Sequence, residues 1–400
     1  RNASTNSVPN CPHDPITNTV SVDILPQILA VQPTLPNLFL PDSQMNAYLW
    51  QMFRIFAFHN SEMAEETIKF GIIGVGHIGA RHAHMIQANP GAELIAIADI
   101  RNREDLSVQD FQVPLYENVE EMLMRHSNIQ VVCIATPNGY HCQHAIQALN
   151  MGCDVVVEKP MALSIEDCDA MIQEAQKRNK RIFCVMQNRF SPPSQWIKSI
   201  INGNVLGEIF QVQVVCYWNR DHRYYKKGHW HGTEDLDGGV LFTQFSHFID
   251  MVYWLLGPLA INYSEFSNFN HQSLTEFDDS GQVLFSFGER GKGSLSFSTS
   301  LYNQNFESSI TIIAENGTVK LGGQYMNDVV YCDIKNYEMP TLPPSSPPND
   351  YGQYKGSAAN HHFVIDEVVN NINHNSPCIT TSQDGRSVVE IIENIHLLKK

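Results

Sequence analysis

The stretch from Ile68 to Asp99 constrains the fold more than any other part of this chain. An apolar run, Ile68–Ile73, is typical of a buried strand and leads directly into Gly74–Gly79, a Gly-x-Gly-x-x-Gly sequence that opens a helical pattern. A second apolar strand, Glu93–Ala98, ends on Asp99. In this order the first glycine makes a tight turn, the second lets the main chain approach a pyrophosphate, and the third lets the helix pack closely on the strand. The sequence therefore predicts a βαβ unit whose helix N-terminus binds the phosphates of a dinucleotide.

Asp99 indicates which dinucleotide binds. An acid at the end of the second strand is placed to accept hydrogen bonds from ribose hydroxyls. It would repel a 2′-phosphate by about 4 kcal/mol per charge pair at a separation of about 4 Å and an effective dielectric constant near 20. This favours NAD over NADP. Arg101 and Arg103 follow closely and could neutralise such a phosphate, so NADP stays open as the less favoured alternative.

Strands and helices alternate from Ile68 to about Gln187, as a parallel, doubly wound sheet requires. In such sheets ligands bind outside the carboxyl ends of the strands, and Thr136–Asn138 and Glu158–Lys159 follow two of these ends. We therefore predict that residues 67–187 form a Rossmann domain. Further strands are expected at Val131–Ala135, Asp154–Val157 and Arg181–Met186, and helices at Val119–His126, His141–Met151 and Ile165–Lys177.

The pattern changes beyond Asn188. Alternating polar and apolar residues predict a mostly antiparallel sheet, which a helix over Val240–Leu256 interrupts. We predict that residues 188–400 form an α+β domain with an open sheet, so the fold class is α/β with two domains. The expected strands are Ile209–Tyr217, Gly281–Phe287, Gly293–Ser300, Ser308–Ala314 and Thr318–Leu321, followed by a Pro- and Ser-rich loop at Thr341–Asn349 and a final helix at Asp384–Leu398.

Composition excludes several classes of partner. The net charge of −16 argues against nucleic acid and anionic membranes, and no apolar run is long enough to span a bilayer. Nine cysteines without paired spacing predict reduced thiols in the cytoplasm. Residues 1–66 differ from the rest, since the first 62 contain no Gly and no Lys but many Pro. We expect a disordered leader or an over-extended gene start, with Met63 as the natural beginning.

Lys159 and His247 are the candidates for proton transfer. Pro160 keeps Lys159 out of the α conformation, and an oxidised nicotinamide nearby would lower the pKa of this amine toward use as a proton acceptor. His247 shares a helix face with Thr243 and Asp250 at i, i+4 and i+7 spacing, where Asp250 could orient the imidazole ring. The alternatives are a surface lysine that caps a strand and a histidine that is satisfied in the core.

The segment from Arg220 to His231 combines cations with aromatic rings. It carries four cations, three histidines and one acid within an acidic chain. Such a loop would attract an anionic substrate, and its Tyr and Trp rings could stack on a sugar or a base. A solvated loop is the alternative. His229 and His231 have the spacing of metal ligands, but no third ligand is evident and no metal site is predicted.

Taken together, these motifs resemble the glucose–fructose oxidoreductase, inositol dehydrogenase and MocA (Gfo/Idh/MocA) family of NAD(P)-dependent sugar dehydrogenases. The resemblance covers about Thr67 to Lys400. It implies a Rossmann domain, a homodimer or homotetramer formed through the open sheet, and acid/base roles for Lys159 and His247 at the sugar hydroxyl. The motifs that carry it are Gly74–Gly79, Glu158-Lys159-Pro160 and the Gly238-Gly239 run that leads to His247.

One departure from the family pattern is Thr243. Members often have Asp four residues before this His, and Thr cannot act as a base. In this respect the chain is similar to the branch that oxidises UDP-N-acetyl-2-amino-2-deoxyglucuronate at C3′. The segments Gln187–Phe190 and Leu236–Gly239 are also similar to that branch. A nucleotide-sugar uronate carries a diphosphate and a carboxylate, which would give the cationic side chains a role: Arg189, Arg220, Arg223, Lys226 and Lys227.

The motifs and the resemblance together define the predicted site. The catalytic residues are Lys159 and His247, and no metal ligands are expected. The predicted NAD-binding residues are Gly74, Gly76, His77, Ile78, Gly79, Asp99, Thr136, Pro137, Asn138, His141, Glu158, Lys159 and Gln187. The predicted substrate-binding residues are Arg189, Arg220, Tyr224, Tyr225, Trp230, Thr243, Gln244, His247 and His361.

The leading hypothesis is an NAD-dependent dehydrogenase that oxidises a ring hydroxyl of a nucleotide sugar to a ketone. A dehydrogenase of free polyols or simple sugars is the close alternative. A dinucleotide-binding sensor without turnover is the third, and Thr243 is the feature that favours it. Whether bound NADH is reoxidised in place by a 2-oxo acid stays open.

Overall fold

The computed structural model describes residues 66–106, 108 and 110–400, which belong to one compact unit. The predicted leader at residues 1–66 lies outside the described residues, apart from Glu66.

The first sheet is the predicted Rossmann sheet. Its six strands are all parallel and run in the order β3-β2-β1-β4-β5-β6, so the strand order reverses between β1 and β4. Ligands bind at such a reversal in doubly wound sheets. The strands are β1 (Ile68–Ile73), β2 (Ala92–Ala98), β3 (Leu115–Tyr116), β4 (Val131–Ile134), β5 (Asp154–Val157) and β6 (Ile182–Cys184).

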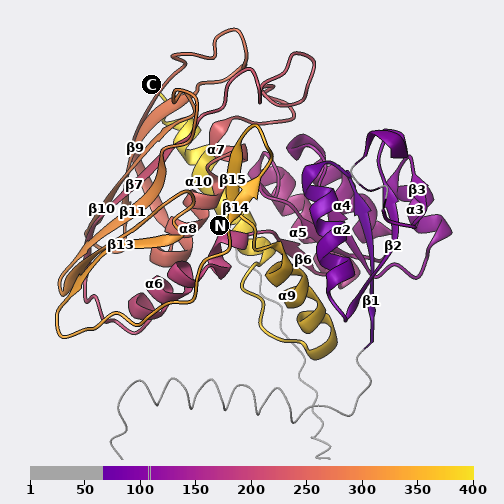
Figure 1. Ribbon diagram of the computed structural model, residues 1–400, viewed down its shortest axis with the longest axis horizontal. Coiled ribbons are helices and arrows are strands. Elements are labelled where there is room, and N and C mark those ends of the chain that lie inside the picture. Colours follow the sequence, from indigo (N-terminus) through magenta and orange to yellow (C-terminus); the bar gives the residue numbers. More distant parts are fainter. Residues whose placement is uncertain (1–65, 107, 109) are drawn as a thin grey trace, which may run out of the picture. The chain divides into compact units, whose positions relative to one another are not determined.

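Helices cover both faces of this sheet, because its strands are apolar on both sides. On one face α3 (Val119–Arg125), α4 (His141–Asn150) and α5 (Ile165–Arg178) contribute to the larger core cluster. On the other, α2 (His77–Ala88) packs with α9 (His361–His374) in a second cluster. Figure 1 shows that α9 belongs to the yellow, C-terminal end of the chain although it covers the N-terminal sheet. The nucleotide-binding fold is therefore completed by residues from beyond the predicted boundary at 187.

The second sheet has seven strands in the order β13-β12-β11-β7-β10-β9-β8 (Figure 1). Only the pair β7 and β10 is parallel, which confirms the prediction of a mostly antiparallel sheet. One face packs into the larger core cluster with three helices, α6 (Pro192–Asn202), α8 (Ser246–Leu256) and α10 (Ser382–Leu397). The strands are β7 (Ile209–Tyr217), β8 (Leu259–Ser267), β9 (Ser280–Phe287), β10 (Gly291–Ser298), β11 (Glu307–Ala314), β12 (Gly317–Gly322) and β13 (Asp328–Ile334).

The helix expected over Val240–Leu256 is two helices, which corrects the prediction. The first, α7 (Val240–Thr243), ends before Gln244, and Phe245 caps the start of α8 with φ −108° and ψ 0°. Tertiary contacts explain the break: both the hydroxyl and the main-chain oxygen of Thr243 bond to residues outside the helix. Thr243 and His247 therefore do not lie on one continuous helix.

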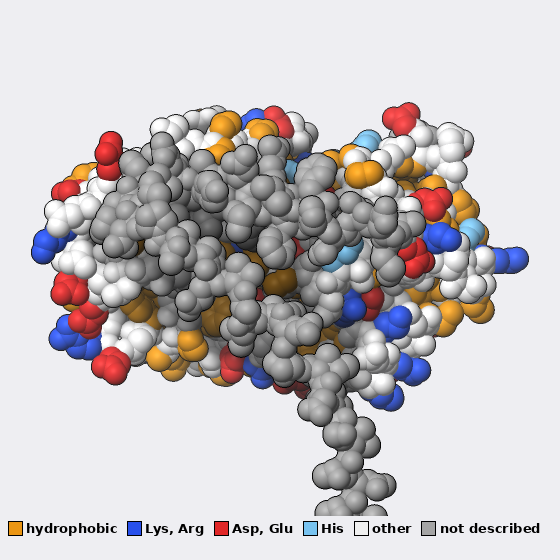
Figure 2. Space-filling model, turned by 90° about the horizontal axis from the view of Figure 1, so that it is seen from below, with side chains coloured by type: hydrophobic (Ala, Val, Ile, Leu, Met, Phe, Trp, Pro, Cys, Tyr) orange, Lys and Arg blue, Asp and Glu red, His pale blue; other side chains and the backbone are white. Residues whose placement is uncertain are grey.

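On the described part of the face shown in Figure 2, both basic (Lys, Arg) and acidic (Asp, Glu) side chains reach the surface. Of the described helices, none is both long and apolar enough to cross a membrane. The eight cysteines that the structure describes are free thiols.

Candidate functional site

The glycine turn between β1 and α2 leaves open space at its second glycine. Gly74 has φ +80°, and a Cβ there would lie 2.7 Å from main-chain atoms of Ala135 and Thr136. A Cβ on Gly79 would lie 2.0 Å from the oxygen of Gly74, so this glycine lets α2 pack against β1. At Gly76 a Cβ would meet no described atom within 4 Å. The N-terminus of α2 has no side-chain cap, and this free space fits the diphosphate of a dinucleotide.

Asp99 follows β2 and lies beside the same turn. Its carboxylate accepts a hydrogen bond from the main-chain N–H of Val75 at 2.7 Å and is paired with Arg101, whose Nη2 lies 2.9 Å away. Burial raises the pKa of Asp99, but the hydrogen bonds from Arg101 and Val75 outweigh it and hold the pKa below its usual value. The acid is therefore ionised at the position expected for a ribose-binding carboxylate.

The residues after β4 mainly support the site. Asn138 donates hydrogen bonds from Nδ2 to the main-chain oxygen of Asp237 at 2.9 Å and to Oγ1 of Thr243 at 2.7 Å. The ring nitrogens of His141 lie 2.8 Å from the oxygen of Pro160 and 3.0 Å from that of Thr136. Because His141 is fully buried between these two oxygens, it joins the ends of β4 and β5. Its predicted role as an NAD-binding residue stays a prediction.

A buried acid and two histidines lie at the end of β5. Glu158 Oε1 is 2.9 Å from Nε2 of His82 and 3.4 Å from Nε2 of His361. Burial raises the pKa of Glu158, but the two histidines outweigh it and bring the pKa well below its usual range. Nδ1 of both histidines and Oε1 of Gln187 are buried without a hydrogen-bond partner among the described residues. Unpaired buried polar atoms are costly, so this cluster fits a polar ligand such as a cofactor.

Lys159 and His247 come from different elements and interact electrostatically. Lys159, which follows β5, donates a hydrogen bond from Nζ to the main-chain oxygen of Thr243 at 2.8 Å. Burial lowers the pKa of Lys159, and the charges of Glu158 and Asp237 partly oppose that shift. Burial, with the charge of Lys159 adding to it, brings the pKa of His247 well below its usual value. A neutral imidazole, whose Nδ1 is buried without a described partner, therefore lies in the electrostatic field of a lysine with a lowered pKa.

Asp237 is a site residue that the sequence interpretation missed. It is fully buried, and its Oδ2 accepts a hydrogen bond from the N–H of Gly232 at 2.8 Å. Its Oδ1 accepts a second hydrogen bond from the hydroxyl of Thr243. Burial raises its pKa to about 6. The available signal was its place directly before Gly238, within the Leu236–Gly239 segment, to which the sequence interpretation gave no site residue.

Arg220 lies at the centre of an aromatic cluster. Its guanidinium carbon is 4.8 Å from the ring centre of Trp218, 5.3 Å from that of Tyr224 and 5.0 Å from that of Tyr354. Its Nε is buried without a described hydrogen-bond partner. Nε2 of Gln244 donates to the hydroxyl of Tyr224 at 3.0 Å, which connects this cluster to the residue after α7. The cluster thus presents a buried cation with donor capacity left over.

Tyr351 connects this cluster to the dinucleotide turn. It lies in the turn between β14 (Pro348–Asp350) and β15 (Lys355–Ala358). Its ring centre is 5.0 Å from that of Tyr354 and 5.5 Å from that of His77, the first residue of α2. The hairpin therefore reaches from the second domain to the N-terminus of α2, a contact that sequence patterns did not indicate.

Arg189 is buried in ion pairs with two carboxylates, and its role in substrate binding stays a prediction. Its guanidinium bonds to Asp250 at 2.5 Å and to Asp384 at 3.1 Å, and its side chain is only 1% exposed. Asp250 is committed to this ion pair, so it does not orient the ring of His247. The pair instead joins the segment after β6 to α8 and α10.

Trp230 and Tyr225, two further predicted substrate-binding residues, lie close to the ring of Tyr224 or to a ring that contacts it. His231 stacks on Trp230, with ring centres 3.8 Å apart, and lies 4.3 Å from the ring of Tyr224. Tyr225 is buried. Among the residues described, no group of three or more His, Cys, Asp or Glu side chains is arranged to hold a metal ion.

Two family models match the chain in succession. Residues 68–186 match the oxidoreductase family model with an NAD-binding Rossmann fold, and residues 194–320 match the Gfo/Idh/MocA C-terminal domain. Relatives include glucose-6-phosphate 3-dehydrogenase of Bacillus subtilis, 32% identical over 54% of this chain and 61% of the relative. Inositol 2-dehydrogenase of Salmonella paratyphi B is 29% identical over 48% of this chain and 55% of the relative. The chain thus spans little more than half the length of these relatives.

Solved structures resemble the chain over most of its length. The WlbA dehydrogenase of Bordetella pertussis, in complex with NADH and UDP-GlcNAcA, is 29% identical, with a TM-score of 0.73 over 83% of this chain and 96% of that one. WlbA of Chromobacterium violaceum, with the same two ligands, is 27% identical, with a TM-score of 0.74 over 84% and 94%. The glycine turn, Asp99 and the two matched domains agree with these findings, and the chain belongs to the Gfo/Idh/MocA family of oxidoreductases with an NAD-binding Rossmann domain.

Proposed function

We propose that this protein is an NAD-dependent sugar dehydrogenase that oxidises a ring hydroxyl to a ketone. The observation that carries the proposal is the electrostatic interaction of Lys159, which follows β5, with the buried imidazole of His247. Lys159 has a lowered pKa, and His247 is neutral with an unpaired ring nitrogen. Pairs of titratable groups whose surroundings shift their pKa values are typical of sites that move protons.

The chain's residues would divide the reaction as follows. NAD, when bound, accepts a hydride from the carbon that carries the hydroxyl. Lys159, in its neutral form, takes the hydroxyl proton while the C–O bond becomes a carbonyl. His247 holds the oxygen through a hydrogen bond, and the unpaired atoms around Glu158 hold polar groups of the nicotinamide riboside. The sugar thus loses one hydride to NAD and one proton to Lys159, and the hydroxyl becomes a ketone.

We further propose a nucleotide-sugar uronate as the substrate, with UDP-N-acetylglucosamine uronate oxidised at C3′. Support comes from Arg220, whose Nε has no described hydrogen-bond partner. This cation, which lies among the rings of Tyr224 and Tyr354, could bind a diphosphate or a carboxylate. The two WlbA structures were solved with UDP-GlcNAcA. Free polyols offer such a cation no anionic group.

The cytoplasmic location and the homodimer or homotetramer remain part of the proposal. Leu284, Ile313 and Tyr331 of the second sheet are 51%, 42% and 51% exposed and would be partly covered in such an oligomer.

Nicotinamide absorbance tests the proposed substrate. The full chain is supplied with NAD and with UDP-sugar uronates, free sugars or polyols, each with and without a 2-oxo acid that would reoxidise bound NADH. The proposal expects reduction with the uronates alone. Arg220→Gln should raise the KM for the uronate. Arg223→Gln is the matched control, since Arg223 is already paired with Asp221.

Each alternative has its own signature in this assay. A response to free polyols would keep the dehydrogenase and overturn the nucleotide-sugar substrate. NAD binding without any sugar-dependent reduction would overturn the enzyme and favour the sensor.

A further inference from the structure

Thr243 connects two charged residues that lie far apart in the sequence. Its main-chain oxygen accepts the hydrogen bond from Nζ of Lys159 at 2.8 Å, and its hydroxyl donates to the carboxylate of Asp237. The same hydroxyl accepts a hydrogen bond from Nδ2 of Asn138 at 2.7 Å. One residue at the end of α7 is therefore held through its side chain by an acid and through its main chain by the lysine.

The hydrogen bonds leave little freedom in this arrangement. Asp237 is itself held by the N–H of Gly232, and its main-chain oxygen accepts from Asn138. With both ends of the connection fixed, a movement of the Asp237 carboxylate would displace Thr243. The oxygen that orients the lysine amine would then move as well.

Charges of both signs face Lys159. Two carboxylates, Glu158 and Asp237, favour its protonated form, whereas burial and the cation of Arg220 oppose it. The other titratable groups that interact with it are Cys184, His141, His231 and His247. Glu158 is already engaged by two histidines. Asp237 is therefore the carboxylate that faces Lys159 from the side of α7.

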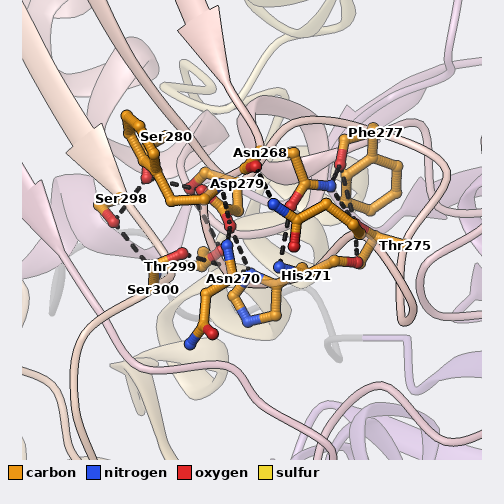
Figure 3. A network of polar contacts seen from close by, with 12 residues as sticks. Asn268, Asn270, His271, Thr275, Phe277, Asp279, Ser280, Ser298, Thr299 and Ser300 are labelled. Atoms are coloured by element: carbon orange, nitrogen blue, oxygen red, sulfur yellow. Dashed lines mark hydrogen bonds and ion pairs between the residues drawn. The ribbon is translucent and has the colours of Figure 1, made fainter.

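A second buried acid shows what a structural carboxylate looks like in this protein (Figure 3). Asp279 accepts hydrogen bonds from the N–H groups of Phe269 and Asn270 at 3.1 and 2.8 Å, from His271 at 2.9 Å and from the hydroxyl of Ser280 at 2.8 Å. These donors outweigh burial and lower its pKa, whereas the pKa of Asp237 is raised. The negative charge of Asp237 is therefore less well stabilised by hydrogen bonds than that of Asp279. Groups whose charged form the fold destabilises are characteristic of functional sites.

We propose that Asp237 is a positioning residue for Lys159 and acts through Thr243. The carboxylate orients the end of α7, so that the oxygen of Thr243 holds Nζ in place, and its negative charge stabilises the ammonium that forms when Lys159 takes the substrate proton. This inference rests on the proposed function for its catalytic consequence. The link between Asp237 and the protonation of Lys159 does not depend on any substrate.

Competitive acetylation of the full chain measures that link directly. Acetic anhydride modifies only neutral amines, so the labelling of the Lys159 peptide across a pH series, read by mass spectrometry, reports the pKa of this lysine. In Asp237→Asn the favourable charge is gone, and we expect the pKa of Lys159 to fall by about one unit. The rising limb of kcat/KM with pH should move to lower pH by the same amount. Asp279→Asn is the matched control, and its Lys159 titration should stay where it is.

Thr243 variants test the route of the effect. Thr243→Ser keeps the hydroxyl and should retain the wild-type titration of Lys159. Thr243→Val keeps the shape but removes the hydrogen bond to Asp237, and we expect a lower kcat with a shifted titration. This pair decides the question even if Asp237→Asn does not fold.

The outcomes separate the inference from the proposed function. An unchanged Lys159 titration in Asp237→Asn, or Thr243→Val equal to Thr243→Ser, would overturn the inference whatever the enzyme's activity. An inactive wild-type protein with an Asp237-dependent Lys159 titration would overturn the proposed function and leave the positioning role standing.

Discussion

Nζ of Lys159 donates a hydrogen bond to the main-chain oxygen of Thr243, 2.8 Å away. The two residues are 84 positions apart, one after a Rossmann strand and the other at the end of α7. Because α7 and α8 are separate helices, this oxygen lies at a helix end, where main-chain oxygens need partners from outside the helix. The break between the helices thus leaves the oxygen of Thr243 available for the hydrogen bond from Lys159.

The pH dependence of turnover should report Lys159. Burial lowers its pKa below the usual lysine value of about 10.4, and the neutral amine is the form that accepts a proton. We therefore expect kcat/KM to rise with pH through a midpoint below about 10.4, and His247, neutral throughout, to add no inflection near pH 6.5. Initial rates between pH 5 and 10 check this, and a rate that falls as pH rises would rule out an amine base.

Asp237 and Asp279 should affect stability in opposite directions. The folded-state pKa of Asp237, about 6, lies above the unfolded value of about 3.9. Its contribution is therefore favourable below pH 4 and is lost as pH rises through 6. At pH 8 we expect Asp237→Asn to be more stable than wild type, by up to about 3 kcal/mol, with the difference vanishing toward pH 4.

The pKa of Asp279 is lowered, so its contribution is present above pH 4 and is lost as pH falls. Asp279→Asn should accordingly lower stability at pH 8. Urea unfolding of both variants at pH 8 and pH 5 measures the contrast. Equal destabilisation by the two substitutions at pH 8 would contradict it.

Asp99 should determine the preference for NAD. Its carboxylate would repel a 2′-phosphate, and Arg101 is held against it. In Asp99→Ser the repulsion disappears and Arg101 is free to pair with a phosphate. The ratio of kcat/KM for NAD to that for NADP should then fall at least about tenfold. Arg101→Ala is the control and should keep the NAD preference, and an unchanged ratio in Asp99→Ser would assign specificity elsewhere.

The ion pair between Arg189 and Asp250 should support the fold without touching the chemistry. Both side chains are 1% exposed. Replacing Asp250 by Ala leaves the buried guanidinium with only one of its two carboxylate partners, Asp384, and we expect a loss of about 3 kcal/mol in the free energy of unfolding. The KM for the substrate should stay near wild type in the folded fraction. A large KM effect with unchanged stability would instead place Arg189 at the substrate site.

Local patterns predicted the first domain closely. The strand Ile68–Ile73, the glycine turn and the acid at Asp99 lie within one continuous segment, so periodicity and turn chemistry were sufficient. The unpredicted α9 shows where such reasoning stops. Its sequence, which begins with two histidines and contains several Asn, is only weakly apolar, and it is stabilised by packing on a sheet formed almost 300 residues earlier.

The site was predictable only where its chemistry lies on one element. Lys159 and the glycines follow strands, but Asp237, Tyr351 and the Glu158–His82 contact arise from long-range packing that spacing does not encode. The ion pairs of Arg189 were not predictable for a related reason, since its two carboxylate partners come from α8 and the start of α10.

The most direct test of the central claim compares wild type and Lys159→Ala in a single turnover with bound NAD and a UDP-sugar uronate. The prediction is that wild type forms NADH and that Lys159→Ala is slower by about 10²–10⁴-fold, while both bind NADH with similar affinity. Lys177→Ala, on the exposed face of α5, should behave as wild type. NADH formation in Lys159→Ala at the wild-type rate would contradict the account.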